Sequence, residues 1–181
     1  MLDGIEIRLA RPEEYGAVGD LTADAYIADG MAHSDYLLTL RDAAARAAAG
    51  DLLVAVDAAT GDVLGTASLF QISAGPKWAE WAASSDDATL RMLAVSPGAR
   101  RRGIARALTV ESIRRAREMG LRRLLLSTGP AMTAAQRLYE QLGFRRAPEA
   151  DWTPVPGVSL LAYWLPLEET TGEHESAGPS R

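Results

Sequence analysis

The stretch LRMLAVSPGARRRGIARALT, residues Leu90–Thr109, joins two regular elements through a short and strongly basic loop. The apolar run Met92–Val95 predicts a buried strand, and the turn residues Ser96–Gly98 end it. Three arginines and Gly103 follow, and small and apolar residues then recur at spacings of three and four over Ile104–Met119, which predicts a helix. The start of a helix exposes unpaired N–H groups and the positive end of the helix dipole. The sequence therefore predicts an anion site between the strand and the helix.

The residue types in this loop suit a diphosphate. Gly103 has no Cβ, so a phosphate could approach the backbone closely. Four arginines add positive charge around it: Arg100, Arg101, Arg102 and Arg106. Each hydrogen bond from an N–H group to a charged phosphate contributes roughly 1.5–3 kcal/mol. The alternative is a solvated turn whose arginines face water, and the pattern R-x-x-G-x-A alone leaves both interpretations open.

The amino-acid composition excludes several classes of protein and several kinds of site. With 181 residues, 48% of them hydrophobic and 24% charged, the chain is typical of one soluble globular domain. The net charge of −5 is unusual for a dedicated nucleic-acid binder, so the arginine cluster is a local feature. The absence of cysteine excludes disulfides, thiolate metal sites and a cysteine nucleophile. His33 and His174 are the only histidines and lie far apart in sequence, so we expect no metal site.

No membrane span or secretory signal is expected, because no apolar run approaches roughly 18 residues and the N-terminal segment is acidic. We therefore expect a cytoplasmic protein. The high arginine and alanine content indicates a GC-rich genome and a bacterial source. The acidic net charge slightly favours a cationic substrate or partner.

The hydrophobic patterns predict a mixed α/β domain over residues 1–167 and a disordered polar tail over 168–181. The predicted strands cover residues 5–10, 51–56, 63–70, 89–95 and 121–128, with two more within 144–150 and 159–165. The predicted helices begin at Pro12 and cover residues 36–49, 104–119 and 131–142. A loop over residues 75–87 contains Trp78 and Trp81. These side chains either form the wall of a substrate pocket, or pack within the loop as a plug, or make an oligomer contact.

Two further segments follow the opening stretch, LLLST at Leu124–Thr128 and AAQRLYEQLGFRR at Ala134–Arg146. Together the three segments closely resemble the GNAT superfamily of N-acetyltransferases. In that family an apolar strand precedes an acetyl-CoA signature of the form Q/R-x-x-G-x-G/A, which here is RRRGIA at Arg100–Ala105. The second motif is LYEQLGF at Leu138–Phe144. The similarity covers Thr89–Arg146, and the predicted order of elements agrees with it.

The resemblance implies the GNAT acyl-CoA N-acyltransferase fold, with a central, mostly antiparallel sheet that is splayed at the cofactor strands and flanked by helices. It implies acetyl-CoA as cosubstrate and no metal. The pantetheine arm would enter the splay and bond to the strand backbone at Leu93, Ala94 and Val95. The pyrophosphate would lie on the loop and helix start, at Arg100, Arg101, Arg102, Gly103, Ile104, Ala105 and Arg106.

Tyr139 in the second motif is the candidate catalytic residue. It lies about 70° around the predicted helix from the apolar stripe, so it can flank the core and reach a cleft. The resemblance implies that it protonates the leaving thiolate; the alternative is a packing tyrosine. An unperturbed tyrosine titrates near 10 and a thiol near 8.5, so this proton transfer is uphill by about 2 kcal/mol unless the site shifts one value.

The general base is not identified by the resemblance. Some relatives have a glutamate where this chain has Ser127, and many have an asparagine where it has Met132. The remaining candidates either act through water or are loop carboxylates in solvent: Glu80, Asp86 and Asp87.

The function predicted from the sequence is that of an acyltransferase of the EC 2.3.1 class. It would transfer the acetyl group from acetyl-CoA to a primary amine by direct attack, with strand amides near Leu93–Val95 stabilising the oxyanion. The acceptor would be a small-molecule or peptide amine, and homodimers are common in the family. The alternatives are a non-catalytic acyl-CoA-binding or regulatory module, and a nucleic-acid contact through Arg100–Arg102.

Overall fold

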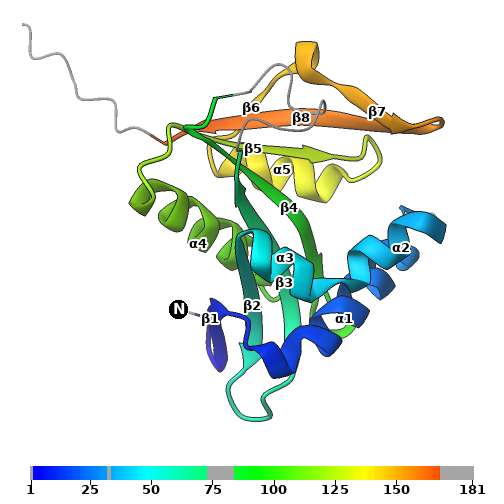
Figure 1. The fold of residues 1–181 in the computed structure, drawn as a ribbon, viewed down its shortest axis with the longest axis vertical. Helices are drawn as coiled ribbons and strands as arrows, with labels where there is room; N and C mark the ends of the chain where they lie inside the picture. The colour runs from blue at the N-terminus through cyan, green and yellow to red at the C-terminus, as the bar shows by residue number, and fades with distance from the viewer. Residues whose placement is uncertain (1, 32–33, 73–83, 168–181) are drawn as a thin grey trace, which may run out of the picture.

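The computed structural model describes residues 2–31, 34–72 and 84–167. Its strands are β1 (Ile5–Leu9), β2 (Asp51–Asp57), β3 (Val63–Gln71), β4 (Asp87–Val95), β5 (Arg123–Thr128), β6 (Arg145–Arg146), β7 (Trp152–Val155) and β8 (Val158–Pro166). Its α-helices are α1 (Tyr15–Ala28), α2 (Ser34–Arg41), α3 (Ala43–Ala49), α4 (Ile104–Glu118) and α5 (Thr133–Gln141). Short 3₁₀ turns lie at Pro12–Glu14, Pro97–Ala99 and Pro148–Ala150. The predicted mixed α/β class is confirmed (Figure 1).

The strands form one sheet in the order β1-β2-β3-β4-β5-β8-β6, and β7 pairs with β8. All neighbours are antiparallel except β4 and β5, which run parallel. That parallel ladder holds three residue pairs only, from Asp87↔Arg123 to Thr89↔Leu125. Both strands continue beyond the last pair without pairing to each other, so the sheet opens there. The expected splay is therefore present.

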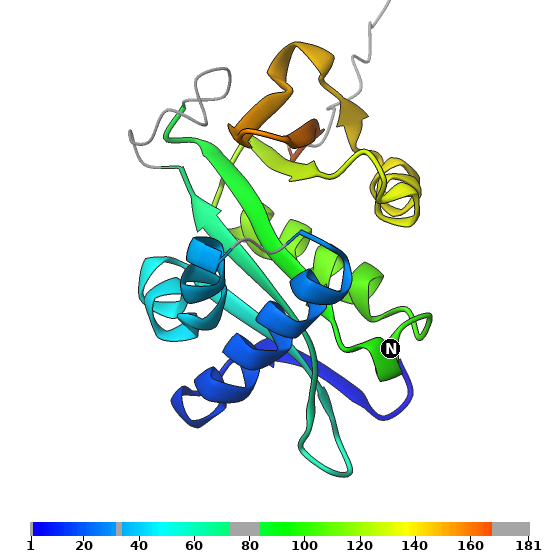
Figure 2. The same cartoon turned by 90° about the vertical axis from the view of Figure 1, so that its right-hand side faces the viewer.

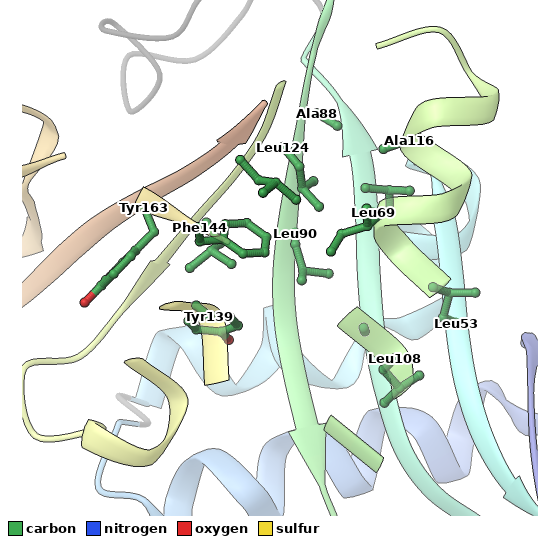
Figure 3. Packing of buried hydrophobic residues seen from close by; sticks show 14 of the residues in the cluster. Leu53, Leu69, Ala88, Leu90, Leu108, Ala116, Leu124, Tyr139, Phe144 and Tyr163 are labelled. Carbon is green, nitrogen blue, oxygen red and sulfur yellow. The ribbon is translucent and has the colours of Figure 1, made fainter. Parts of the chain in front are cut away.

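Helices cover both faces of the sheet (Figures 1 and 2), and the strands are apolar on both sides for that reason. Along β2 the residues alternate between the two layers. Leu53 and Ala55 pack in the cluster that contains α4, whereas Leu52, Val54 and Val56 pack against α1 and α3. The larger cluster continues across β4 and β5 to Tyr139, Phe144 and Tyr163 (Figure 3).

A glycine lets α4 approach the sheet closely. A Cβ on Gly65 of β3 would lie 2.8 Å from Cγ2 of Ile104 and 3.2 Å from Cδ1 of Leu108. Both of these α4 side chains are fully buried. Since α4 begins directly after the arginine loop, this contact fixes the position of the loop relative to β4.

The structure differs from the predicted elements at two places. The helix predicted over residues 36–49 is two helices, because the carboxylate of Asp42 accepts a hydrogen bond from the Ala45 amide at 2.9 Å and starts α3 anew. The second difference is the β7–β8 hairpin, whose turn contains Gly157 at φ 85°. The first of these strands was missed because it contains Pro154, which a strand tolerates only at an edge.

Two sequence predictions concern residues that the structure does not describe. The polar tail over residues 168–181 and most of the loop that contains Trp78 and Trp81 lie outside the described residues. The division into a domain and a tail therefore stays a prediction. Among the helices that are described, none combines the length and apolar character needed to cross a bilayer.

Candidate active site

A cleft of about 600 Å³ opens where β4 and β5 diverge. It is lined by β4, by the start of α4, by the end of β5, by α5 and by the last turns of α1. Nine of the residues predicted to bind the cofactor or to act in catalysis line it: Leu93, Ala94, Val95, Arg100, Arg101, Gly103, Ile104, Ala105 and Tyr139. Arg102 and Arg106 are exposed and do not line it. The structure thus brings together the loop, the strand and the tyrosine that the sequence singled out.

A bulge in β4 lies at the centre of this cleft. Ser68 of β3 pairs with Arg91, but Thr66 pairs with Ala94, so β4 has one residue more than β3 over this step. Met92 within the bulge has a φ of 51°, which is rare for a residue with a side chain. Such a conformation costs about 1–3 kcal/mol and is kept where the surrounding packing enforces it. Met92 is 6% exposed and packs with Ala23 and Leu40.

The bulge is followed by backbone amides that face the opening. The Ser96 amide donates to the Leu64 carbonyl on β3 at 2.9 Å. Peptide groups alternate in direction along a strand, so the amides of Val95 and Leu93 point to the opposite side, towards β5. Because β5 no longer pairs with β4 there, these amides are placed to bond a ligand in the cleft.

The arginine loop presents a second set of amides. Arg101 and Gly103 both have left-handed backbone conformations, with φ of 62° and 79°. The first helical hydrogen bond of α4 runs from the Ala107 amide to the Gly103 carbonyl at 3.0 Å. The amides of Ile104, Ala105 and Arg106 precede it and have no side-chain cap, so they are open to an anion.

The structure gives a reason for glycine at position 103 that the sequence analysis did not include. A Cβ on Gly103 would point at Cδ2 of Leu2, at 3.1 Å. The absent side chain therefore faces the N-terminal segment, and the predicted close approach of a phosphate to Gly103 stays a prediction. Glycine is needed here because of its positive φ.

Tyr139 lies deep in the wall of the cleft. Its ring is 6% exposed and packs edge-on against Phe144 at 5.7 Å and tilted against Tyr163 at 6.3 Å between ring centroids. Figure 3 shows these rings together beside β4. Its hydroxyl makes no hydrogen bond to any residue that the structure describes. Burial raises the pKa of Tyr139, so the hydroxyl stays protonated and available as a donor.

Tyr26 of α1 lines the same cleft and was missed by the sequence analysis. Burial raises its pKa first of all, and the neighbouring Tyr36 and Tyr139 raise it further. The rings of Tyr26 and Tyr36 meet edge to face at 6.0 Å. Tyr26 of α1 and Tyr139 of α5 therefore both line the cleft. No local pattern in α1 marks Tyr26, because its place in the site comes from the packing of α1 on β4.

The two candidate bases that the structure describes, Asp86 and Asp87, lie outside the cleft. Asp87 is 1% exposed and accepts two hydrogen bonds from Arg123, at 2.8 and 2.7 Å, at the paired end of β4 and β5. Asp86 is exposed. Neither lines the cleft, and Glu80 and His33 lie outside the described residues. Among the described residues Asp29 is the one carboxylate in the lining, and it pairs with Arg100 at 3.1 Å.

Two residues in the lining of the cleft, Ser127 and Met132, stand where some relatives have a glutamate or an asparagine. The hydroxyl of Ser127 accepts a hydrogen bond from the indole N–H of Trp152 at 3.2 Å. The sulfur of Met132 accepts a hydrogen bond from the hydroxyl of Thr128 at 3.6 Å. Both positions are thus occupied by packing and structural contacts. Within the described ranges no group of three His, Cys, Asp or Glu side chains is arranged to hold a metal ion.

A known protein family matches the part of the chain that forms most of this cleft. The model of the acetyltransferase (GNAT) family matches residues 17–144. The chain belongs to this family. No curated protein sequence matches it.

Solved GNAT structures share the fold over nearly the whole chain. An acetyltransferase from Staphylococcus aureus Mu50 has 17% identity and a TM-score of 0.71, covering 91% of this chain and 99% of its own. A GCN5-related N-acetyltransferase from Kribbella flavida has 26% identity and a TM-score of 0.66, covering 91% and 98%. The protein yncA from Salmonella typhimurium, solved with its cofactor acetyl-CoA, has 21% identity and a TM-score of 0.67, covering 93% and 97%.

Proposed function

We propose that this GNAT protein transfers the acetyl group of acetyl-CoA to a primary amine by direct attack. One observation carries the proposal: a single cleft is lined by the arginine loop, by the amides of splayed β4 and by Tyr139. The residues present fit the cosubstrate, because open amides at the start of α4 suit a pyrophosphate and strand amides suit an extended amide-containing arm. Acetyl-CoA supplies the activated acyl group when it is bound. A cytoplasmic location, a bacterial source and a homodimer remain predictions from the sequence.

The strand amides and Tyr139 have different roles in the proposed reaction. The Leu93 and Val95 amides orient the pantetheine arm, and the Leu93 amide donates to the thioester carbonyl oxygen as negative charge develops there. Tyr139 donates its hydroxyl proton towards the sulfur as the carbon–sulfur bond breaks and the carbon–nitrogen bond forms. The same burial that raises the pKa of Tyr139 acts on a thiol in that place, so the two proton affinities rise together. The amine loses its proton to water, and Tyr139 regains a proton from water before the next turnover.

The acceptor amine must be neutral to attack. A lysine-like amine with a pKa of about 10.4 is neutral in about one molecule in 10³ at pH 7, whereas an α-amine with a pKa of about 8 is neutral in about one in ten. The cleft lining that the structure describes contains no carboxylate other than the paired Asp29. This favours an acceptor whose amine has a low pKa.

The test is thiol release from acetyl-CoA over a panel of amines, with the wild type and Tyr139→Phe. We expect the variant to bind coenzyme A as the wild type does in calorimetry, and to turn over about 10²-fold more slowly, the usual contribution of a positioned acid. Unchanged turnover would remove Tyr139 from the mechanism.

The alternative is a non-catalytic acyl-CoA-binding module, which Ser127 and Met132 favour because they replace polar auxiliaries. It predicts coenzyme A binding with no thiol release from any amine. That outcome would contradict the proposed transferase.

A further inference from the structure

We propose that the acceptor is a primary amine with an apolar body, and that this body packs against Met31, between Tyr26 of α1 and the turn after β5. This inference rests on the proposed function and specifies its substrate class. For the part of the acceptor beyond its amine, it replaces the cationic molecule favoured by the net charge of the chain.

Methionines are concentrated in the lining of the cleft. Three of the five methionines of the chain line it: Met31, Met92 and Met132. They come from three separate segments, the turn after α1, the bulge of β4 and the residue before α5. The methionine side chain is unbranched and polarizable, and it is over-used at surfaces that bind apolar partners of different shapes. This concentration indicates an adaptable apolar wall.

The end of α1 fixes the position of Met31 relative to Tyr26. The Gly30 amide donates to the Ile27 carbonyl at 3.0 Å, and Gly30 has a φ of 69°. The Met31 amide donates to the Tyr26 carbonyl at 2.9 Å. These two hydrogen bonds and the left-handed glycine form a Schellman motif, in which the residue after the glycine often contacts the one five positions earlier. The backbone therefore places both Met31 and Tyr26 on the α1 side of the cleft, where both line it.

Met31 reaches the opposite side of the opening. A Cβ placed on Gly129, in the turn after β5, would lie 3.7 Å from Cε of Met31 and 3.6 Å from Cγ of Met132. Side chains from the end of α1 and from the start of α5 therefore converge on one glycine. Both methionines are partly exposed, so part of their surface remains accessible. A molecule that binds here packs on thioether side chains, which can change rotamer to accommodate it.

The charged groups of the described lining are already engaged or belong to the arginine loop. Asp29 pairs with Arg100 at 3.1 Å. Arg91 has an interaction of its own within the protein. Arg101 lies in the loop where the pyrophosphate is expected. A second cationic group on the acceptor would therefore find only a paired carboxylate in the described lining, whereas an apolar group would find Met31.

An apolar site also assists the reaction, because the described lining offers no unpaired carboxylate as a base. Taking an ammonium group out of water disfavours its charged form, so the pKa of a bound amine falls. Burial of the apolar body offsets the cost of this step, since each buried methylene strengthens binding about fourfold. The apolar body thus holds the acceptor and favours the neutral amine that attacks.

The experiment compares amines of matched length. Thiol release gives kcat/KM for ethylamine, propylamine, butylamine and pentylamine. Two polar counterparts are included, 3-amino-1-propanol to match butylamine and 1,4-diaminobutane to match pentylamine. We expect kcat/KM of the wild type to rise about threefold with each methylene and to be about tenfold lower for each polar counterpart. The counterparts are no stronger as bases than the alkylamines, so a difference in neutral fraction does not produce this preference.

Variants of Met31 test the assignment to this residue. Met31→Gln keeps the length of the side chain and makes its end polar, so kcat/KM should become nearly independent of chain length. Met31→Leu keeps an apolar side chain and should keep the rise. Met119→Gln, at the exposed end of α4 and outside the lining, is the matched control and should keep the rise in full. Calorimetry with coenzyme A shows for each variant that the cleft is still formed.

The outcomes separate this inference from the proposed function. A wild type whose kcat/KM is flat along the series, or highest for the diamine, would overturn the inference and leave the transferase standing. The wild-type series decides the substrate class even if a variant fails to fold. A rise that persists in Met31→Gln would overturn the assignment to Met31. No thiol release from any amine would overturn both proposals.

Discussion

The two ends of the β4–β5 pair differ, and each end has an aspartate–arginine pair. At the closed end Asp87 is 1% exposed and is held by two hydrogen bonds from Arg123 on the neighbouring strand. At the open end Arg100 and Asp29 meet at 3.1 Å between a loop and the end of α1, and their side chains are 42% and 32% exposed. The closed end is built to fix the strands, whereas the open end leaves the two charges accessible to a ligand. The cleft exists because the strands are fixed at one end and released at the other.

The largest effect is expected from breaking the closed end. Arg123→Gln leaves the Asp87 carboxylate buried without its cation, so the free energy of unfolding should fall by about 3 kcal/mol. Urea unfolding at pH 7 measures this. Asp86→Asn, a change at the exposed neighbouring position, should stay within about 0.5 kcal/mol. Equal stabilities of Arg123→Gln and the wild type would show that the short ladder needs no ion pair.

The second largest effect is expected at the open end, from a substitution in the arginine loop that weakens coenzyme A binding. Gly103→Ala places a Cβ in a left-handed conformation at φ 79°, which costs about 1–2 kcal/mol, so the loop should relax to another backbone. We expect coenzyme A affinity in calorimetry to fall about tenfold. Gly98→Ala is the matched control, because no heavy atom lies within 4 Å of its Cβ and its φ is not positive. An affinity loss of the same size in both variants would contradict the role given to the positive φ.

The sequence predicted which residues line the open end better than it predicted the shape of that end. The loop Arg100–Ala105 and Tyr139 were found because their residue types are set by local needs, an anion site and a motif tyrosine. The bulge at Met92 leaves no local signal, since an apolar residue in an apolar run predicts a regular strand. Tyr26 joins the lining of the cleft only through the packing of α1 on β4, which no single segment encodes.

The bulge supplies a third prediction, in which the usual order of stability of an alanine and a glycine variant is reversed. Met92→Ala and Met92→Gly both lose the buried side chain, but only glycine accepts the φ of 51° without strain. In an ordinary strand position glycine is less stable than alanine. Here Met92→Gly should be more stable than Met92→Ala by about 1 kcal/mol in urea unfolding. At position 88, in the closed end of β4, alanine is the native residue, and Ala88→Gly should give the ordinary order, with glycine less stable than alanine.

The smallest effect is expected at the exposed ion pair of the open end. Asp29→Asn removes a pair of this exposed kind, which contributes about 0.2–1 kcal/mol, so the free energy of unfolding should hardly change. The same substitution frees Arg100 at the edge of an anion site and removes a negative charge from the lining of the cleft. Coenzyme A affinity at low salt should therefore rise about threefold, and the gain should shrink as salt screens the charges. Asp20→Asn, which removes the exposed partner of Arg41 on the outer side of α1, should alter neither quantity. Weaker binding by Asp29→Asn would mean that the pair positions Arg100 for the cosubstrate, and the open end would then depend on its ion pair as the closed end does.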